Sequence, residues 1–152
     1  MEVAIIEFNE NEIENLRKLT REWIDRYFYL EPEDEAFLED PVAKVIDHGG
    51  HIFLAKYGEQ TIGTVSLLKR DPDTYELAKL AVTAQYQGLK VGHKLIEHCL
   101  HIAKQAGIRK IILDTNRKLT AAVALYQKYG FEEVPIADQK YIEVDLKMEL
   151  AI

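Results

Sequence analysis

Thiols, long apolar runs and export signals are scarce in this sequence. Of its 152 residues only Cys99 is a cysteine, which excludes an internal disulfide. Cys99 stands at helical spacing among apolar neighbours, so we expect a buried thiol in a cytoplasmic protein. No stretch reaches the roughly 18 apolar residues of a membrane-spanning helix. The first residues also lack a basic segment followed by an apolar run, so we expect neither export nor a membrane partner.

Positive charge is scarce as well. Lys and Arg together number 19 and Asp and Glu 26, which leaves a formal net charge of −7. Such a surface repels phosphate backbones and offers no basic stripe, so nucleic acid is not expected as a partner. A cationic substrate is favoured instead, and the acidic run from Glu31 to Glu35 either attracts it or is simply solvated.

Metal-ligating residues do not form a convincing group. His93, Glu97 and His101 recur every fourth residue and would share one face of a helix. That face is opposite the apolar stripe that contains Leu95 and Cys99, a pattern typical of solvated surface. We therefore expect no metal site.

The sequence does have the composition of a globular protein. Hydrophobic residues make up 47% and charged residues 30% of the chain, which argues against a disordered or fibrous protein. Its length suits one hydrophobic core. We expect a single domain over residues 1–152, as a monomer or a homodimer.

Hydrophobic periodicity predicts an alternation of strands and helices. Strands are predicted at 3–8, 51–57, 61–69, 74–82, 110–114 and 141–150, and helices after Asn9 or Asn11, at 91–106 and at 121–128. The runs 51–57 and 61–69 flank a turn at Gly58 and predict a hairpin. The segment 27–46 mixes aromatic and acidic residues and is expected to be helical and partly mobile. This order indicates an α+β domain with one mixed sheet.

The segment from Gln87 to Gly92 lies between a predicted strand and a predicted helix. Backbone N–H groups at a helix start have no intrahelical partner and carry the positive end of the helix dipole, so such a turn can hold a pyrophosphate. The segment has neither the Gly-Lys-Ser/Thr ending of a nucleoside-triphosphate loop nor a G-x-G-x-x-G pattern. On its own it fits an ordinary strand-to-helix turn as well as a phosphate site.

In order, spacing and residue type, the chain from Glu76 to Phe131 resembles the GNAT superfamily of N-acetyltransferases. The family's phosphate signature, Gln/Arg-x-x-Gly-x-Gly/Ala, reads here Gln87-x-x-Lys90-x-Gly92. Residues 76–82 are similar to the family's central strand, and the segments 113–116, 121–126 and 129–131 to its second cofactor-binding region. The resemblance implies a mixed, twisted, mostly antiparallel sheet flanked by helices.

The same resemblance implies an enzyme that transfers the acetyl group of acetyl-CoA to a primary amine, on a small molecule or a protein. Direct transfer in a ternary complex is expected, because Cys99 is predicted to be buried and no serine or cysteine has an evident activating base. Two alternatives are a non-catalytic sensor of CoA or acyl-CoA and an interaction protein that pairs through its last strand. The acceptor amine is not identified by the sequence. The aromatic residues Trp23, Tyr27, Phe28 and Tyr29 are candidates for its pocket, with core packing favoured for Trp23.

The resemblance also implies which residues bind acetyl-CoA. The backbone of Leu80, Ala81 and Val82 is expected to follow the pantetheine arm and to aim an N–H at the thioester carbonyl. The residues expected at the pyrophosphate are Gln87, Gly88, Leu89, Lys90, Val91 and Gly92. Asn116 is expected either to hydrogen-bond the pantetheine arm or to cap a helix. Lys90 replaces the usual second glycine, and we expect that its position does not require a positive φ, so that its ammonium approaches a phosphate.

Two side chains are candidates for proton transfer. Glu76 is placed by the resemblance where some family members carry their basic glutamate, and a water chain or an exposed or ion-paired glutamate are the alternatives. Tyr126 is placed where the proton donor to the CoA sulfur lies, and it also contributes to cofactor binding. The alternative for Tyr126 is a tyrosine that packs beside Leu125 and Tyr129.

Overall fold

A computed structural model describes residues 2–136 and 143–152, and of residues 87 and 88 it describes only the backbone. Within these residues seven strands form one sheet in the order β1-β2-β3-β4-β5-β7-β6. Its strands are β1 (Val3–Glu7), β2 (His51–Tyr57), β3 (Gln60–Asp71), β4 (Thr74–Val82), β5 (Lys110–Thr115), β6 (Glu132–Val134) and β7 (Leu146–Ala151). Neighbouring strands are antiparallel except β4 and β5, which are parallel. The predicted mixed, mostly antiparallel sheet is thus confirmed.

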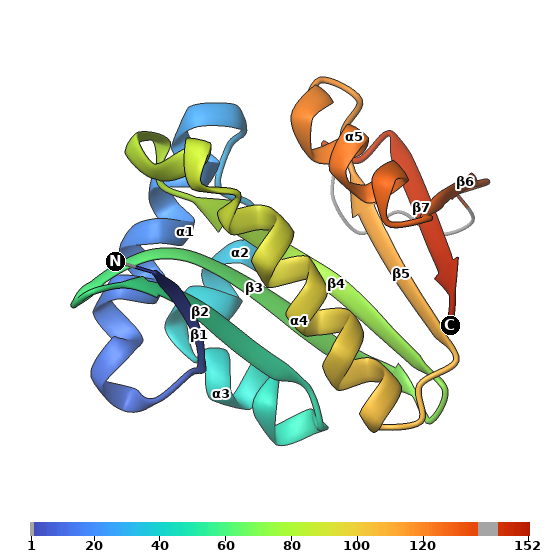
Figure 1. Ribbon diagram of the computed structural model, residues 1–152, viewed down its shortest axis with the longest axis horizontal. Coiled ribbons are helices and arrows are strands. Elements are labelled where there is room, and N and C mark those ends of the chain that lie inside the picture. Colours follow the sequence, from blue (N-terminus) through green and yellow to red (C-terminus); the bar gives the residue numbers. More distant parts are fainter. Residues whose placement is uncertain (1, 137–142) are drawn as a thin grey trace.

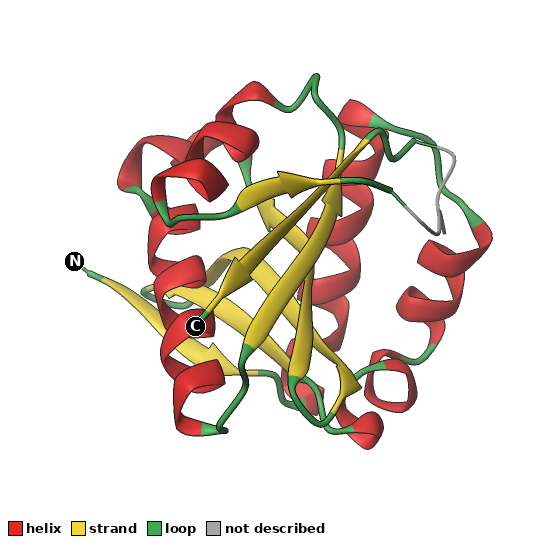
Figure 2. Cartoon of the chain, turned by 90° about the vertical axis from the view of Figure 1, so that its right-hand side faces the viewer, coloured by secondary structure: helices red, strands yellow, loops and turns green. Residues whose placement is uncertain are grey.

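Helices cover both faces of this sheet (Figure 1, Figure 2). They are α1 (Ile13–Tyr27), α2 (Pro32–Glu39), α3 (Pro41–Lys44), α4 (Val91–Gln105) and α5 (Thr120–Lys128), together with the 3-10 helices η1 (Glu10–Glu12), η2 (Ile46–His48) and η3 (Ala84–Leu89). Asn9 caps the start of this series, because its side chain accepts a hydrogen bond from the Asn11 N–H at 3.0 Å. Gly107, at φ +75°, ends α4 in the left-handed conformation that favours glycine.

Strand β2 carries apolar side chains on both of its faces, because both faces of the sheet are covered. Phe53 and Ala55 point toward α4, in the larger core cluster, whereas Ile52 and Leu54 belong to a second cluster with Leu16 of α1. Successive side chains of a strand point to opposite faces. A strand covered on both sides therefore reads as the continuous apolar run that the sequence shows.

The last predicted strand begins later than the sequence pattern indicates. Of the predicted range 141–150, residues 141 and 142 lie outside the described part, and 143–145 form no strand. The chain is held there by other bonds: the Asp145 N–H donates to the Thr115 carbonyl at 3.1 Å. Strand β6 was not predicted, because three residues are too few to show a period.

Cys99 has none of its surface exposed, as predicted, and burial raises the pKa of its thiol. Its helix, α4, buries Val91, Leu95 and Cys99 on the predicted stripe, but Ala106 at the end of that stripe is exposed. The helix ends at Gln105, so Ala106 no longer follows the helical period. No helix in the described ranges is both long enough and apolar enough to span a bilayer.

The parallel pair β4 and β5 separates along its length. Only Thr74, Tyr75 and Glu76 pair with β5, opposite Lys110, Ile111 and Ile112. Beyond Glu76 the two strands diverge, and Figure 1 shows the opening between them. The β3–β4 register also shifts between Thr64 and Ser66, where Lys79 adopts φ +58°. Such a bulge bends and twists its strand, and it lies just beyond Glu76, the last residue of β4 that pairs with β5.

His98 of α4 gives a test of pH-dependent stability. Its ring packs edge-on against Phe53, with the ring centroids 4.5 Å apart. Burial lowers the pKa of His98, His101 and His51 lower it further, and Glu7 opposes them. Because the pKa in the folded chain lies below the unfolded value of about 6.5, the neutral ring's contribution is complete above that pH and is lost as the pH falls through and below it.

We therefore expect the melting temperature to fall between about pH 7.5 and pH 5.5, and to fall less in His98→Gln, which does not titrate there. Melting curves of the wild type and the variant at both pH values measure this difference. His48→Gln is the matched control because His48 is exposed. Equal pH dependence in His98→Gln and the wild type would contradict the assignment.

Candidate active site

A cleft of about 460 Å³ opens where β4 and β5 separate. One wall comes from α1 and the turn that follows it, including Trp23, Tyr27, Phe28 and Tyr29. The floor is β4, and the opposite wall is formed by the end of β5 and by α5. The start of α4 closes one end through Lys90, Gly92 and His93. The segments that sequence reasoning assigned to one site thus border one cavity.

The backbone of β4 is hydrogen-bonded on one side and faces the cleft on the other. Ala81 and Val82 lie opposite Thr64 and Gly63 of β3, whereas no β5 residue is paired with them. Leu80 and Val82 line the cleft, and Ala81 is buried. An extended ligand can therefore use the polar groups on this open edge as an additional strand would.

The turn before α4 contradicts our expectation for Lys90. Its backbone adopts φ +57° and ψ +35°, the left-handed conformation, so this position does require a positive φ. The reason is local: Lys90 joins η3 to α4, and the left-handed residue redirects the chain between the two helices. A non-glycine residue is disfavoured here by roughly 1 kcal/mol relative to glycine. Lys90 still lines the cleft.

The remaining residues of the turn differ in what they expose. Leu89 is 41% exposed, whereas Val91 has none of its surface exposed, so neither its side chain nor its backbone reaches the cleft surface. Gln87 and Gly88 belong to η3, and the structure describes only their backbone. The first N–H groups of α4 have no intrahelical acceptor by the geometry of a helix start, which suits an anion.

Gly92 lies where α4 approaches α5. A Cβ atom at this position would meet Cδ2 of Leu125 at 3.1 Å, closer than most such contacts. Glycine therefore allows the two helices to approach at the closed end of the cleft.

Glu76 is ion-paired and lines the cleft at the same time. Its Oε1 accepts a hydrogen bond from Nε of Arg70 at 2.7 Å, and its side chain is 8% exposed. The ion pair agrees with one alternative that the sequence left open, an ion-paired strand glutamate. Glu76 is the last residue of β4 that pairs with β5, and it lies at the point where the cleft begins.

Tyr126 is buried in α5 with its ring at the cleft. It is 6% exposed, and its ring packs edge-on against Phe131 with centroids 5.8 Å apart. Burial, and then the neighbouring Cys99, raise the pKa of the Tyr126 phenol above its ordinary value of about 10. The phenol is therefore fully protonated around neutral pH and can donate that proton.

Asn116 holds the loop that follows β5. Its Nδ2 donates to the Glu143 carbonyl at 2.6 Å, and its Oδ1 accepts from the Lys118 N–H at 2.9 Å. The N-cap of α5 is Leu119, so of the two alternatives for Asn116 the helix cap is wrong, and the contact with the pantetheine arm stays a prediction. The short turn from 116 to 119 places the cap three residues later, and the Leu119 N–H donates to the Asn116 carbonyl.

Two of the three polar residues on one face of α4, His93 and Glu97, contact Tyr129 at the end of α5. The Tyr129 hydroxyl donates to Oε2 of Glu97 at 2.9 Å, and the His93 and Tyr129 rings lie 6.1 Å apart. Burial and this hydrogen bond raise the pKa of Tyr129 to about 12. In the parts of the chain that the structure describes, no three His, Cys, Asp or Glu side chains are arranged to hold a metal ion.

Sequence reasoning missed two cationic contacts of the cleft. Nζ of Lys118 lies 4.4 Å from the centroid of the Phe28 ring, and Nζ of Lys79 donates to Oδ1 of Asp34. Trp23 is half-buried beside Phe28, with ring centroids 5.3 Å apart, rather than in the core. The run of aromatic residues signalled this wall, but no local pattern links either lysine to its partner.

This open sheet, which is splayed at its parallel pair and has a helix start at the splay, is an acyltransferase architecture. The model of the acetyltransferase (GNAT) family matches residues 14–131, and the chain belongs to that family. A GNAT-family acetyltransferase from Staphylococcus aureus Mu50 has a similar structure, with a TM-score of 0.89, 25% identity and 99% of both chains covered. The PaiA N-acetyltransferase of Thermoplasma acidophilum, in complex with coenzyme A, gives a TM-score of 0.79 at 20% identity with both chains fully covered.

Named relatives are similar over part of their length. Rat N-acetyltransferase 8B is 32% identical over 92 residues, which is 57% of this chain and 41% of that protein. The Bacillus subtilis N-acetyltransferase YvbK is 31% identical over 101 residues, 64% of this chain and 65% of that protein. In both cases the chain spans less than two thirds of the relative.

Proposed function

We propose that this chain is an acetyl-CoA-dependent N-acetyltransferase that passes an acetyl group directly to a primary amine. The observation that carries the proposal is the cleft at the β4–β5 splay, which joins an open strand edge, a helix start and a buried phenol. The coenzyme A in the related PaiA structure supports the choice of cofactor. We further propose that residues 1–152 form one such domain, since one continuous sheet includes strands from both ends of the described chain.

The residues of the cleft fit the parts of acetyl-CoA. The amide groups of a pantetheine arm match the open backbone edge at Leu80 and Val82. A pyrophosphate matches the N–H groups at the start of α4 around Gly92 and His93, which line the cleft and lie at the positive end of the helix dipole. An N–H of β4 near the bulge stabilises the carbonyl oxygen that becomes negative as the new bond forms.

The reaction then requires two proton transfers. The nitrogen lone pair of a neutral amine attacks the thioester carbonyl carbon, a C–N bond forms, and the C–S bond breaks. Glu76, directly or through a water, accepts the proton of the amine. Tyr126 donates its proton to the departing thiolate and regains one from solvent. The products are an amide and CoA thiol.

The acceptor amine is proposed to enter beside the aromatic wall. The rings of Trp23, Tyr27 and Phe28 form a tilted cluster with centroid distances of 5.3 to 6.5 Å. Lys118 already places an ammonium on the Phe28 ring, which shows that a cation is compatible with this wall. A panel of amines, assayed for CoA thiol release, identifies the acceptor and separates the enzyme from a non-catalytic sensor, which releases none.

Gly92→Val tests the phosphate site. The added side chain covers the N–H groups at the start of α4, so we expect the affinity for CoA to fall roughly tenfold or more. Isothermal calorimetry measures this change. A melting curve shows whether the contact with Leu125 has also disturbed the fold.

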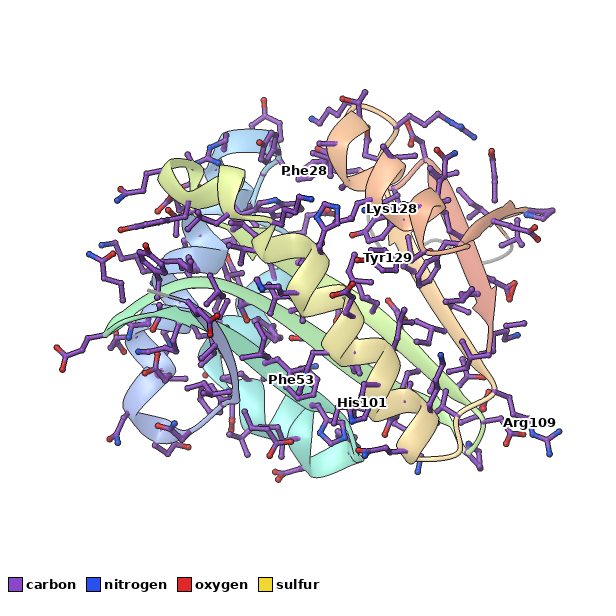
Figure 3. The ribbon with its side chains drawn as sticks, in the orientation of Figure 1. Phe28, Phe53, His101, Arg109, Lys128 and Tyr129 are labelled. Atoms are coloured by element: carbon purple, nitrogen blue, oxygen red, sulfur yellow. The ribbon has the colours of Figure 1, made fainter. Side chains whose placement is uncertain are left out.

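The matched control is His101→Val, which introduces the same side chain more than two turns further along α4. His101 is exposed and lies toward the other end of the helix (Figure 3). We expect wild-type CoA affinity in this control. Unchanged affinity in Gly92→Val would remove the turn from the CoA site.

A further inference from the structure

Two lysines are the only described non-glycine residues with positive φ, and both line the cleft. Lys90 redirects the chain into α4. Lys79 lies within β4, at the bulge where the register against β3 shifts. A lysine is rarely left-handed, and such a conformation persists only where the surrounding contacts determine it.

Two contacts of Lys79 come from α2, whose Asp34 also lines the cleft. Its Nζ donates to Oδ1 of Asp34, and the ammonium lies 5.8 Å from the centroid of the Phe37 ring. The lysine side chain is 12% exposed and that of Asp34 8%. An ammonium that is buried to this degree needs a carboxylate beside it.

The second oxygen of Asp34 is engaged at the start of α2. Oδ2 accepts a hydrogen bond from the Glu31 N–H at 3.0 Å, so Asp34 also holds the turn that leads into this helix. That turn directly follows Phe28 and Tyr29 of the aromatic wall. One carboxylate thus connects the wall of the cleft to the bulge in its floor.

We propose that Asp34 is a positioning residue for acetyl transfer. Through Lys79 it holds the bulge of β4 in the conformation that aims the backbone N–H groups after the bulge into the cleft. The inference rests on the proposed function, because the bulge matters for catalysis only if the thioester carbonyl lies beside it. Asp34 itself contacts no reacting atom in this account.

The conformational preference of glycine provides the test. Asp34→Asn keeps an oxygen for the Glu31 N–H but removes the charge that holds Lys79, so the bulge is expected to relax. We expect kcat to fall roughly tenfold or more while the KM for acetyl-CoA changes little, since the phosphate turn is untouched.

The double variant Asp34→Asn/Lys79→Gly has no ammonium to hold, and glycine adopts the left-handed conformation without steric penalty. The double variant is therefore expected to recover kcat to within about threefold of wild type.

The control is Asp40→Asn, the same change at a helix start outside the cleft. Oδ1 of Asp40 accepts from the Ala43 N–H at 3.1 Å at the beginning of α3. Its kcat is expected to equal that of wild type. A kcat in Asp34→Asn equal to that of this control, or a double variant no more active than Asp34→Asn, overturns the proposal. If Asp34→Asn alone does not fold, the double variant is still expected to fold, and its failure to do so also overturns the proposal.

A second readout does not depend on activity. The NMR shifts of the Leu80 and Ala81 amides are expected to move in Asp34→Asn and to return toward wild type in the double variant. If wild type acetylates no amine, the proposed function fails while these shifts still report the coupling. Unmoved Leu80 and Ala81 amides in Asp34→Asn overturn the positioning role whatever the activity.

Discussion

Glu76→Gln is expected to lower kcat by roughly 10²-fold near neutral pH while the affinity for CoA stays close to that of wild type. Glutamine keeps the size of the side chain and an oxygen for Arg70 but cannot accept the proton of the amine. Steady-state rates with an acceptor found by the amine panel, together with calorimetry for CoA, measure both quantities.

The ion pair with Arg70 makes a control necessary. Arg70→Gln breaks the same pair but leaves the carboxylate in the cleft, where it can still accept a proton. If Glu76 is the base, Arg70→Gln retains much more activity than Glu76→Gln at similar thermal stability. Equal losses of activity and of melting temperature in the two variants would make the pair structural. Full activity in Glu76→Gln would favour a water chain as the base.

Tyr126→Phe is the second large effect. Phenylalanine preserves the ring that packs against Phe131 and removes only the hydroxyl proton. We expect kcat to fall by roughly 10- to 10²-fold, with little change in the KM for acetyl-CoA or in the melting temperature. Because burial raises the pKa of this phenol, we expect no loss of activity from its ionisation between about pH 7 and pH 9.

Tyr129→Phe is the matched control on the same stretch of chain. Its hydroxyl is bonded to Glu97 rather than directed into the cleft, so the same substitution leaves the proposed chemistry untouched. Rates and melting curves of both variants are compared with wild type. If Tyr126→Phe loses activity only in proportion to lost thermal stability, Tyr126 is a packing residue, and the thiolate takes its proton from water.

Local signals were sufficient for most of the fold. Strand β4 has the predicted bounds, 74–82, because its apolar run ends at turn residues on both sides. The hairpin of β2 and β3 and the stripe of α4 follow from period and turn chemistry in the same way. Each of these features depends on residues that are close together in the sequence, so local patterns were enough to predict it.

The site could be predicted only as segments. Motif order placed the start of α4, the strand β4 and Tyr126 around one cofactor, and the structure gathers them around one cleft. It gave no partner for Glu76, it misjudged the backbone of Lys90, and it left two roles open for Asn116. A backbone φ and a loop hydrogen bond depend on where the next element must begin, which residue type alone does not specify.

The sequence by itself determined the family, the order of the longer strands and helices and the burial of Cys99, because each of these is expressed in the period or spacing of residues close along the chain. The tertiary structure alone decided that β4 and β5 separate after Glu76 and that a left-handed Lys79 reaches Asp34, 45 residues earlier. Such contacts depend on the packing of whole layers, and the energies of burial and charge pairing that select them come from atoms far apart in sequence.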